Sequence, residues 1–166
     1  MGLVVAVEGS SDRIAVETLA TRLGVDLEAR GISVVAVGGA QGIGRFVAGL
    51  DPGERVVGLC DAAEERYFSR ALGRHLFVCD PDLEGELIRA IGAGRVEEVL
   101  AEQGDLAPFR TLQKQPQWRG RPVAEQLHRY FGSGGRRKIR YARYLVEALD
   151  LDHVPAPLAE LFAWIA

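Results

Sequence analysis

Cysteine, histidine and methionine are scarce in this sequence of 166 residues, which holds two, three and one of them respectively. Cys60 and Cys79 each end an apolar run, and neither belongs to a CxxC pair. We therefore expect both to be reduced core residues, not metal ligands or disulfide partners. The histidines are scattered along the chain, which argues against a histidine metal site.

Long apolar runs are also missing. No stretch approaches the ~20 apolar residues that a membrane span needs, and no basic region precedes the apolar N-terminal residues as it does in a signal peptide. These absences predict a cytoplasmic protein with no membrane association. The apolar content of 48% and the charged content of 26% are typical of a soluble globular protein, and the length suits one domain.

Charges of the two signs are segregated. Residues 1–109 contain 18 acidic and ten basic residues, whereas residues 110–144 contain ten basic residues and Glu125 as the one acid. Residues 145–166 contain four acids and no base. This distribution favours a protein that binds metal cations and a polyanion together, although an acidic domain with a basic surface helix is an alternative.

Apolar runs of strand type alternate with helical patterns in units of about 25 residues. The strands are expected at residues 3–7, 32–37, 55–60 and 75–79, and the helices at residues 10–23, 43–50, 62–72, 81–91 and 96–103. This alternation predicts an α/β fold, Rossmann-like, with a mostly parallel four-stranded sheet and helices on both faces. Residues 1–104 would form this core. Residues 105–166, with a loop at 113–122 and helices at 123–131, 138–149 and 158–165, would form a helical C-terminal extension packed on it within a single domain.

Acidic residues follow three of the expected strands. Glu8 directly follows the first strand, Asp61 the third, and the acidic run 80–86 the fourth, while Asp12 lies four residues after Glu8. Because the carboxyl ends of parallel strands share one edge of a sheet, these carboxylates should lie close together. Crowded carboxylates repel one another unless a cation neutralises them, and an all-oxygen set suits Mg²⁺ or Mn²⁺.

Several of these acids also have a purely structural interpretation. Asp12 can be a first-turn acid that matches the helix dipole, and Asp80 before Pro81 has the pattern of a helix N-cap. Dipole matching also accounts for Asp82 and Glu84, and solvated helix faces account for Glu64, Glu65 and Glu86. Glu8 and Asp61 are the hardest to explain in this way, because each directly ends an apolar strand.

Three cations, Arg136, Arg137 and Lys138, stand at the start of an expected helix, where they oppose the helix dipole. An anionic partner would relieve this penalty. Lys138 extends the core-facing stripe of that helix, so its charge needs a partner inside the protein, and it could stabilise developing charge on a phosphate. Arg140 and Arg143 share the opposite face with Arg136, where they would be solvated or would contact phosphates.

Four segments resemble a TOPRIM domain: Val-Glu-Gly-Ser-Ser-Asp-Arg at 7–13, Leu-Cys-Asp at 59–61, Asp-Leu-Glu at 82–84 and Arg-Arg-Lys at 136–138. Over nearly its whole length the chain is similar to the TOPRIM domain of the OLD (overcoming lysogenization defect) nucleases. The resemblance implies a metal-dependent nuclease, or a related nucleotidyl transferase or hydrolase, that acts on phosphodiester bonds with one or two Mg²⁺ or Mn²⁺ ions.

The resemblance also implies roles for particular residues. The implied metal ligands are Glu8, Asp12, Asp61, Asp82 and Glu84, and Glu8 could also act as a general base. Lys138 matches the active-site lysine. The expected partner is nucleic acid, DNA rather than RNA, with Arg136, Arg137, Arg140 and Arg143 as candidate contacts.

The sequence departs from the family pattern in two ways. TOPRIM domains usually carry Asp-x-Asp after the third strand, but here Asp61 is followed by Ala62 and Ala63. The loss of the second aspartate would weaken one metal site unless Glu64 or Glu65 replaces it, so a weakened nucleic-acid- or nucleotide-binding subunit is the alternative. A phosphatase-like enzyme for a small metabolite is a third reading.

OLD proteins join this domain to an ATPase. The glycines near residue 40 lack the lysine of a phosphate-binding P-loop and are interpreted as a turn. The domain is therefore expected to act alone or with a separate ATPase or other protein partner.

Overall fold

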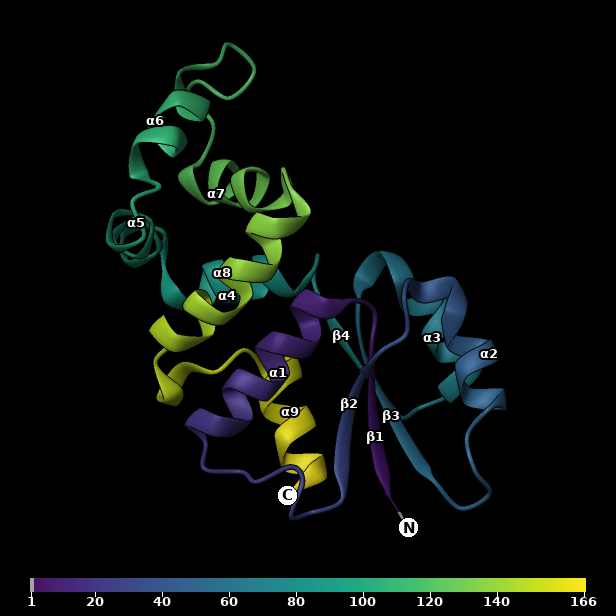
Figure 1. The fold of residues 1–166 in the computed structure, drawn as a ribbon. Coiled ribbons are helices and arrows are strands. Elements are labelled where there is room, and N and C mark those ends of the chain that lie inside the picture. The colour runs from purple at the N-terminus through teal and green to yellow at the C-terminus, as the bar shows by residue number, and fades with distance from the viewer. Residues whose placement is uncertain (1) are drawn as a thin grey trace.

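The computed structural model describes residues 2–166 and confirms the predicted fold class. The described chain contains a four-stranded sheet in the order β2-β1-β3-β4 (Figure 1), formed by β1 (Leu3–Val7), β2 (Ile32–Ala36), β3 (Arg55–Asp61) and β4 (Leu76–Cys79). All neighbouring strands are parallel. Val7 is paired with Ala36 and with Leu59, and Asp61 is paired with Cys79, so the carboxyl ends of the strands meet at one edge.

Helices cover both faces of the sheet. They are α1 (Ser10–Arg22), α2 (Ile43–Ala48), α3 (Glu65–Leu72), α4 (Leu83–Ile91), α5 (Ala93–Glu102), α6 (Leu106–Lys114), α7 (Val123–Gly132), α8 (Gly135–Ala148) and α9 (Ala156–Ile165). Figure 1 shows α2 and α3 on one face, and α1 and α9 on the other, with α8 and α4 beyond α1. Two apolar clusters, one on each side of the sheet, form the core.

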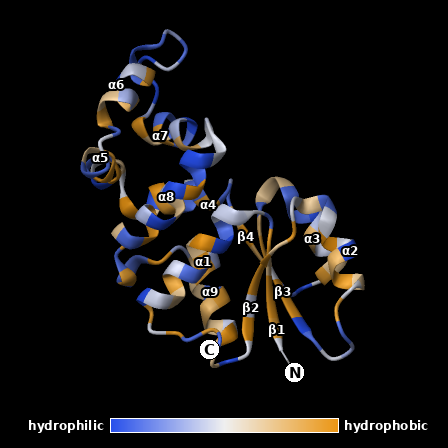
Figure 2. Ribbon diagram, in the orientation of Figure 1, coloured by the Kyte–Doolittle hydropathy of each residue, from blue (hydrophilic) through white to orange (hydrophobic). Residues whose placement is uncertain are grey.

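The strands are rich in β-branched residues because both of their faces are buried. Val5 and Val57 have no exposed surface, and the sheet is accordingly one of the most apolar parts of the ribbon in Figure 2. Gly58 lets α3 approach β3 closely, since a Cβ atom there would lie 2.6 Å from Leu72 Cδ1 and 2.9 Å from Phe68 Cδ1. The sheet is thus a rigid support for the residues at its carboxyl edge.

Helices α1 and α8 lie side by side and run in the same direction. At their C-terminal ends, Arg22 Nη1 donates hydrogen bonds to the carbonyl oxygens of Val146 at 2.7 Å and Leu149 at 2.5 Å. The Val146 carbonyl oxygen also accepts the Leu149 N–H at 3.2 Å, so Arg22 adds a charged donor to the carbonyl groups at the end of α8. The arrangement brings the N-terminus of α8, with Lys138, to the same edge as the N-terminus of α1, with Asp12.

Some element boundaries differ from the sequence predictions. Helix α8 begins at Gly135, three residues earlier than expected, so Arg136 and Arg137 belong to its first turn. The cap predicted at Asp80 was wrong: α4 begins at Leu83, and Asp82 is its N-cap because its Oδ1 atom accepts the Gly85 N–H at 2.8 Å.

Helix α6 was not predicted at all. Its proline, Pro108, lies in the first turn, where a missing N–H breaks no helical hydrogen bond. Cys60 and Cys79 are buried and free, as expected. Within residues 2–166 no helix combines the length and the apolar character needed to cross a membrane. The division of the chain at residue 104 stays a prediction.

Candidate metal centre

The acidic residues singled out from the sequence come from two strand ends and two helix starts at one edge of the sheet. Glu8 follows β1, and Asp61 ends β3. Asp12 lies in the first turn of α1, while Asp82 and Glu84 lie at the start of α4, which follows β4. The topology therefore brings together the five carboxylates that we expected to be neighbours.

Asp12 and Glu84 are the most deeply buried of these carboxylates, with 8% and 7% of their surface exposed. Asp12 Oδ2 accepts the backbone N–H of Gly9 at 2.9 Å, so this side chain fixes the turn that follows Glu8. Gly9 is the N-cap residue of α1. Asp12 thus has the structural role considered above, but its burial exceeds what a first-turn acid requires.

Asp61 and Asp82 connect different parts of the chain. Asp61 Oδ1 accepts the Leu83 N–H at 3.3 Å and so ties the end of β3 to the start of α4. Asp82 Oδ2 lies 2.6 Å from His128 Nε2 of α7. The role of His128 was not predictable from the sequence, because nothing in a separation of 46 residues indicates its contact with Asp82.

Lys138 is the cation of this cluster. Its Nζ atom lies 3.4 Å from Glu84 Oε1, and its side chain is 36% exposed. Burial alone would lower the pKa of Lys138, but the charges of Glu84, Asp12 and Asp61 outweigh burial and raise it. Lys138 is therefore a fixed positive charge among the carboxylates, on the inward side of α8 as predicted.

Four carboxylates of the cluster have raised pKa values: Glu8, Asp12, Asp61 and Glu84. Burial is the largest cause in each case, and the charges of neighbouring carboxylates add to it. The pKa of Asp61 rises to about 7, with Asp12, Asp82 and Glu84 as the contributing charges. A group of acids in which burial and mutual repulsion together outweigh the charge of Lys138 has the electrostatics of a cation site.

The pH dependence of stability tests this electrostatic description. Asp61 titrates near 7 in the folded protein and near its ordinary 3.8 when unfolded, so the folded state binds more protons between these values. The free energy of unfolding of the metal-free protein should therefore receive a stabilising contribution at low pH that is lost as the pH rises from about 4 to about 7. Thermal melts in EDTA across this range measure it. Asp61→Asn should flatten the dependence, and an unchanged slope in that variant would contradict the assignment.

The donor set suits a hard divalent cation, because it consists of carboxylate oxygens only. With the side chains as they stand, however, no group of three or more acidic, histidine or cysteine residues in the described chain is arranged to hold a metal ion. Asp12, Asp82 and Glu84 are each engaged with protein partners. Metal binding would thus require side-chain rotations that exchange some of these contacts for ligation.

The residues that follow Asp61 form a short 3-10 turn, Ala62–Glu64. Glu64 is half-buried, and its charge is the largest carboxylate contribution to the raised pKa of Glu8. Glu65 is exposed. Of the two glutamates considered as replacements for the aspartate missing at Ala63, Glu64 is the one that lies near the cluster.

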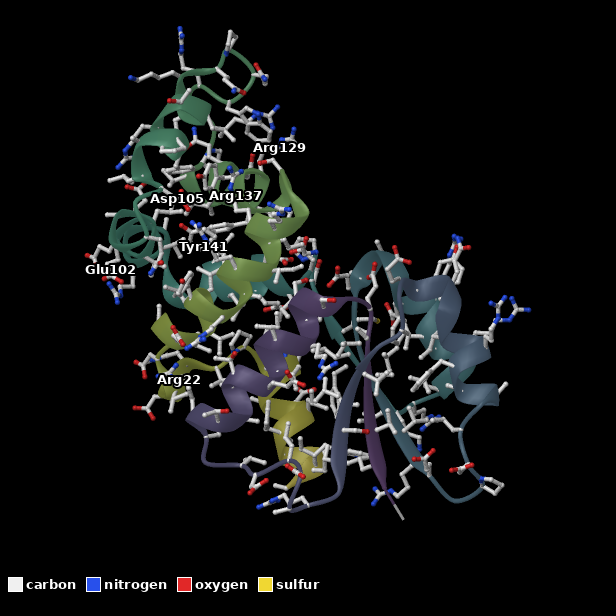
Figure 3. The ribbon with its side chains drawn as sticks, in the orientation of Figure 1. Arg22, Glu102, Asp105, Arg129, Arg137 and Tyr141 are labelled. Carbon is white, nitrogen blue, oxygen red and sulfur yellow. The ribbon has the colours of Figure 1, made fainter. Side chains whose placement is uncertain are left out.

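The four arginines of α8 differ in their surroundings. Arg140 pairs with Asp105, whose Oδ2 atom also accepts the Tyr141 hydroxyl at 2.6 Å (Figure 3 labels Asp105 and Tyr141). Arg143 pairs with Glu147 at 2.7 Å. Arg137 donates to the Tyr130 carbonyl oxygen at 3.0 Å, and Arg136 is exposed in the first turn. Protein carboxylates already compensate Arg140 and Arg143.

Comparison with known proteins supports the fold described above. The family model described as "Overcoming lysogenization defect protein-like, TOPRIM domain" matches residues 3–52. The C-terminal region of the Xanthomonas campestris pv. campestris OLD protein is similar in structure, with a TM-score of 0.72 and 25% identity over 98% of this chain and 91% of that one. The C-terminal region of the Burkholderia pseudomallei OLD protein gives a TM-score of 0.65 and 20% identity over 99% and 98% of the two chains. No curated protein matches the sequence significantly.

These matches confirm the resemblance inferred from the sequence. The chain has the fold of the C-terminal TOPRIM region of OLD proteins, and the matched segment 3–52 includes β1 and the first turn of α1 with Glu8 and Asp12. The assignment of individual ligands stays a prediction.

Proposed function

We propose that this chain, with its OLD-type TOPRIM fold, is a metal-dependent nuclease that cleaves phosphodiester bonds of nucleic acid. The observation that carries the proposal is the cluster of buried, mutually repelling carboxylates around Lys138 at the carboxyl edge of the sheet. Mg²⁺ or Mn²⁺ would be held by Glu8, Asp12, Asp61, Asp82 and Glu84.

Divalent ions bound at such a cluster supply an activated water and neutralise charge on the phosphate. The protein's own groups have separate tasks. Glu8 contributes a carboxylate as a ligand or accepts the proton of the attacking water, and its raised pKa makes it a stronger base than an ordinary glutamate. Lys138, held against Glu84, stabilises negative charge that develops on the phosphate.

The basic first turn of α8 is proposed to contact the polymer. Arg136 and Arg137 precede Lys138 on this turn and would bind flanking phosphates, DNA rather than RNA being the expected polymer. Arg140 and Arg143 are weaker candidates because they have carboxylate partners. Since the similar structures are C-terminal regions of OLD proteins, we propose that a further protein region or a separate ATPase acts with this domain.

A catalytically weakened binding subunit is the second candidate, and Ala63 is the observation that favours it. Glu64 supports the enzyme instead, because its charge acts on Glu8. If Glu64 replaces the missing aspartate, Glu64→Ala should weaken Mn²⁺ binding by about 10- to 100-fold. Glu65→Ala is the matched control, since the neighbouring carboxylate is exposed and should leave binding unchanged. Isothermal titration with Mn²⁺ measures both, and equal affinities in the two variants would rule out this role of Glu64.

The direct test of the proposed function is cleavage of supercoiled plasmid and of single-stranded RNA with Mg²⁺, with Mn²⁺ and with EDTA. Cleavage that requires the metal supports the nuclease. Folded protein that binds nucleic acid without cutting it under any of these conditions supports the binding subunit.

A further inference from the structure

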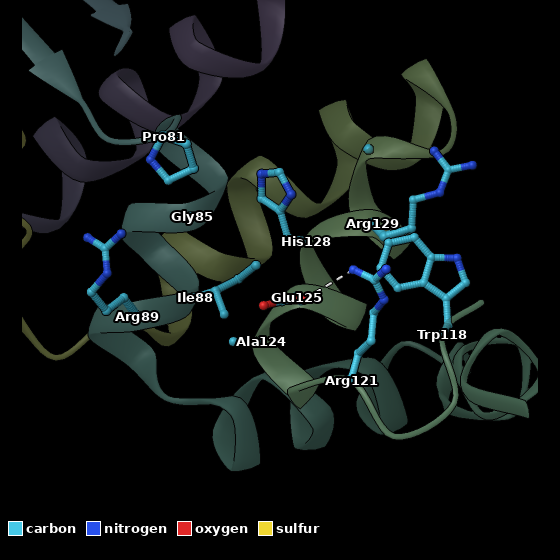
Figure 4. A pocket seen from close by; sticks show the side chains of 11 residues that line it. Pro81, Gly85, Ile88, Arg89, Trp118, Arg121, Ala124, Glu125, His128 and Arg129 are labelled. Carbon is cyan, nitrogen blue, oxygen red and sulfur yellow. Dashed lines mark ion pairs between the residues drawn. The ribbon is translucent and has the colours of Figure 1, made fainter. Parts of the chain in front are cut away.

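A cavity of about 600 Å³ lies between α4, α7 and the loop that precedes α7 (Figure 4). Pro81 and Ile88 line it on the side of α4, and Trp118 and Ala124 line it on the side of the loop and α7. Its volume falls within the roughly 300–1,000 Å³ of small-molecule sites. The residues that line this cavity belong neither to the carboxylate cluster nor to the basic start of α8, so the functions proposed for those two features do not explain it.

The cavity combines an apolar lining with a cationic rim. Most of its surface is apolar, and Arg89, Arg121 and Arg129 lie around it (Figure 4). The acidic residue among those that line it, Glu125, is paired with Arg121 at 3.6 Å, and Arg89 is paired with Glu86 at 3.1 Å. Among the described residues, Arg129 is the arginine of this rim without a carboxylate partner. An apolar cavity edged by arginines fits a ligand that has a flat apolar part and an anionic part.

The backbone of Trp118 is held in position before any ligand arrives. Its carbonyl oxygen accepts the Nε2–H of the buried Gln126 at 2.8 Å, and its N–H donates to the Gln115 carbonyl oxygen at 2.9 Å. The Arg121 guanidinium lies 5.2 Å from the centre of the indole ring. Indole and guanidinium surfaces are both platforms on which nucleobases stack.

The cavity adjoins the carboxylate cluster through His128. His128 lines the cavity and contacts Asp82 at 2.6 Å, and Pro81 and Gly85, which also line it, flank the acidic start of α4. A nucleotide seated in the cavity would therefore belong to a strand that continues toward Asp82 and Glu84.

We propose that this cavity binds an unpaired nucleobase of the nucleic-acid strand, stacked on Trp118 and Arg121, beside the carboxylate cluster. The proposal rests on the proposed function and deepens it, since it names a strand with unpaired bases as the substrate class. A duplex without unpaired bases has no free base face to offer, whereas phosphates alone leave the apolar lining unused.

Tryptophan fluorescence tests stacking directly, because the chain contains two tryptophans that can be observed separately. Trp164 lies beneath the Arg55 guanidinium and against the His75 ring, and it is not among the residues that line the cavity. In the Trp164→Phe variant, Trp118 is the one remaining tryptophan and its fluorescence is observed alone. In the Trp118→Phe variant, the fluorescence of Trp164 is observed alone. The probes are a ten-nucleotide oligothymidylate, the corresponding oligouridylate, a blunt duplex and an abasic strand of equal length, each in Ca²⁺ and in EDTA.

The proposal predicts that the two single strands quench Trp118 and leave Trp164 unchanged. The abasic strand, which carries phosphates without bases, should bind without quenching, and the duplex should quench far less. Comparison of the thymidylate and uridylate strands shows whether DNA or RNA is preferred. Absence of quenching of Trp118 by both single strands would overturn the proposal.

Two variants of Trp118 distinguish loss of base stacking from loss of folding. Trp118 also packs on the core, so Trp118→Leu keeps apolar volume and Trp118→Phe keeps a ring. Affinity for the single strands should fall by about tenfold in Trp118→Leu and by much less in Trp118→Phe. Equal affinities in two folded variants would overturn the proposal.

The outcomes also separate this proposal from the proposed function. Metal-dependent cleavage without quenching of Trp118 would support the nuclease function and contradict the proposed base-binding site. Quenching of Trp118 without cleavage would support the base-binding site. It would contradict the nuclease function and favour the binding subunit.

Discussion

Replacing Glu8 by alanine is expected to lower metal-dependent cleavage by at least about a thousandfold. Glu8 directly follows β1, and its carboxylate experiences the charges of Glu64 and Asp12. Its removal takes away either a metal ligand or the base that accepts a proton from water. Initial rates of plasmid cleavage in Mn²⁺ measure the effect.

Glu17→Ala is the matched control for this experiment. Glu17 lies on α1, but its carboxylate pairs with Arg13 on the surface at 2.8 Å, and such pairs contribute little to stability. It should cleave at the wild-type rate. Full activity in a folded Glu8→Ala variant would contradict the proposal that the carboxylates at this edge of the sheet take part in cleavage.

Replacing Lys138 by methionine is expected to separate catalysis from metal binding. Cleavage should fall by about a hundredfold or more, because the charge that stabilises the phosphate is lost. Mn²⁺ binding should be retained or become tighter, because the positive charge among Glu84, Asp12 and Asp61 is gone and the Glu84 carboxylate is released. A purely structural role for Lys138 would instead weaken both properties together.

Arg136→Met is the comparison for Lys138→Met. Arg136 belongs to the same first turn of α8 but is exposed. Its loss should raise KM and reduce the salt dependence of binding while kcat is retained. If Lys138→Met shows this same pattern, Lys138 binds the polymer and does not act in the chemical step.

The sequence was sufficient to predict the sheet and the edge at which the acids gather. The strand-type runs are continuous and apolar because both faces of the sheet are buried, and Glu8 and Asp61 interrupt that pattern where the strands end. The helical stripe that contains Lys138 likewise indicated its inward position, which the contact with Glu84 now explains. Such features depend on local periodicity, which a single sequence contains.

Contacts between distant segments could not be predicted in this way. The pairs His128 with Asp82 and Arg140 with Asp105 join residues 46 and 35 positions apart, and neither has a spacing signal. The cavity at Trp118 depends on the packing of α7 against α4, and therefore on tertiary structure alone. The cap of α4 was placed at Asp80 because the Asp-Pro pattern is common at helix starts, whereas the geometry selects Asp82.

Titration of the metal-free protein with Mn²⁺, followed by electron paramagnetic resonance and by competition with Mg²⁺, tests the central claim most directly. The claim is that the carboxylates around Lys138 form a divalent-metal centre. Saturable Mn²⁺ binding that Mg²⁺ displaces and that Asp61→Asn together with Glu8→Gln abolishes is the predicted result. Binding that is absent in the wild-type protein, or that persists unchanged in the double variant, would contradict the claim.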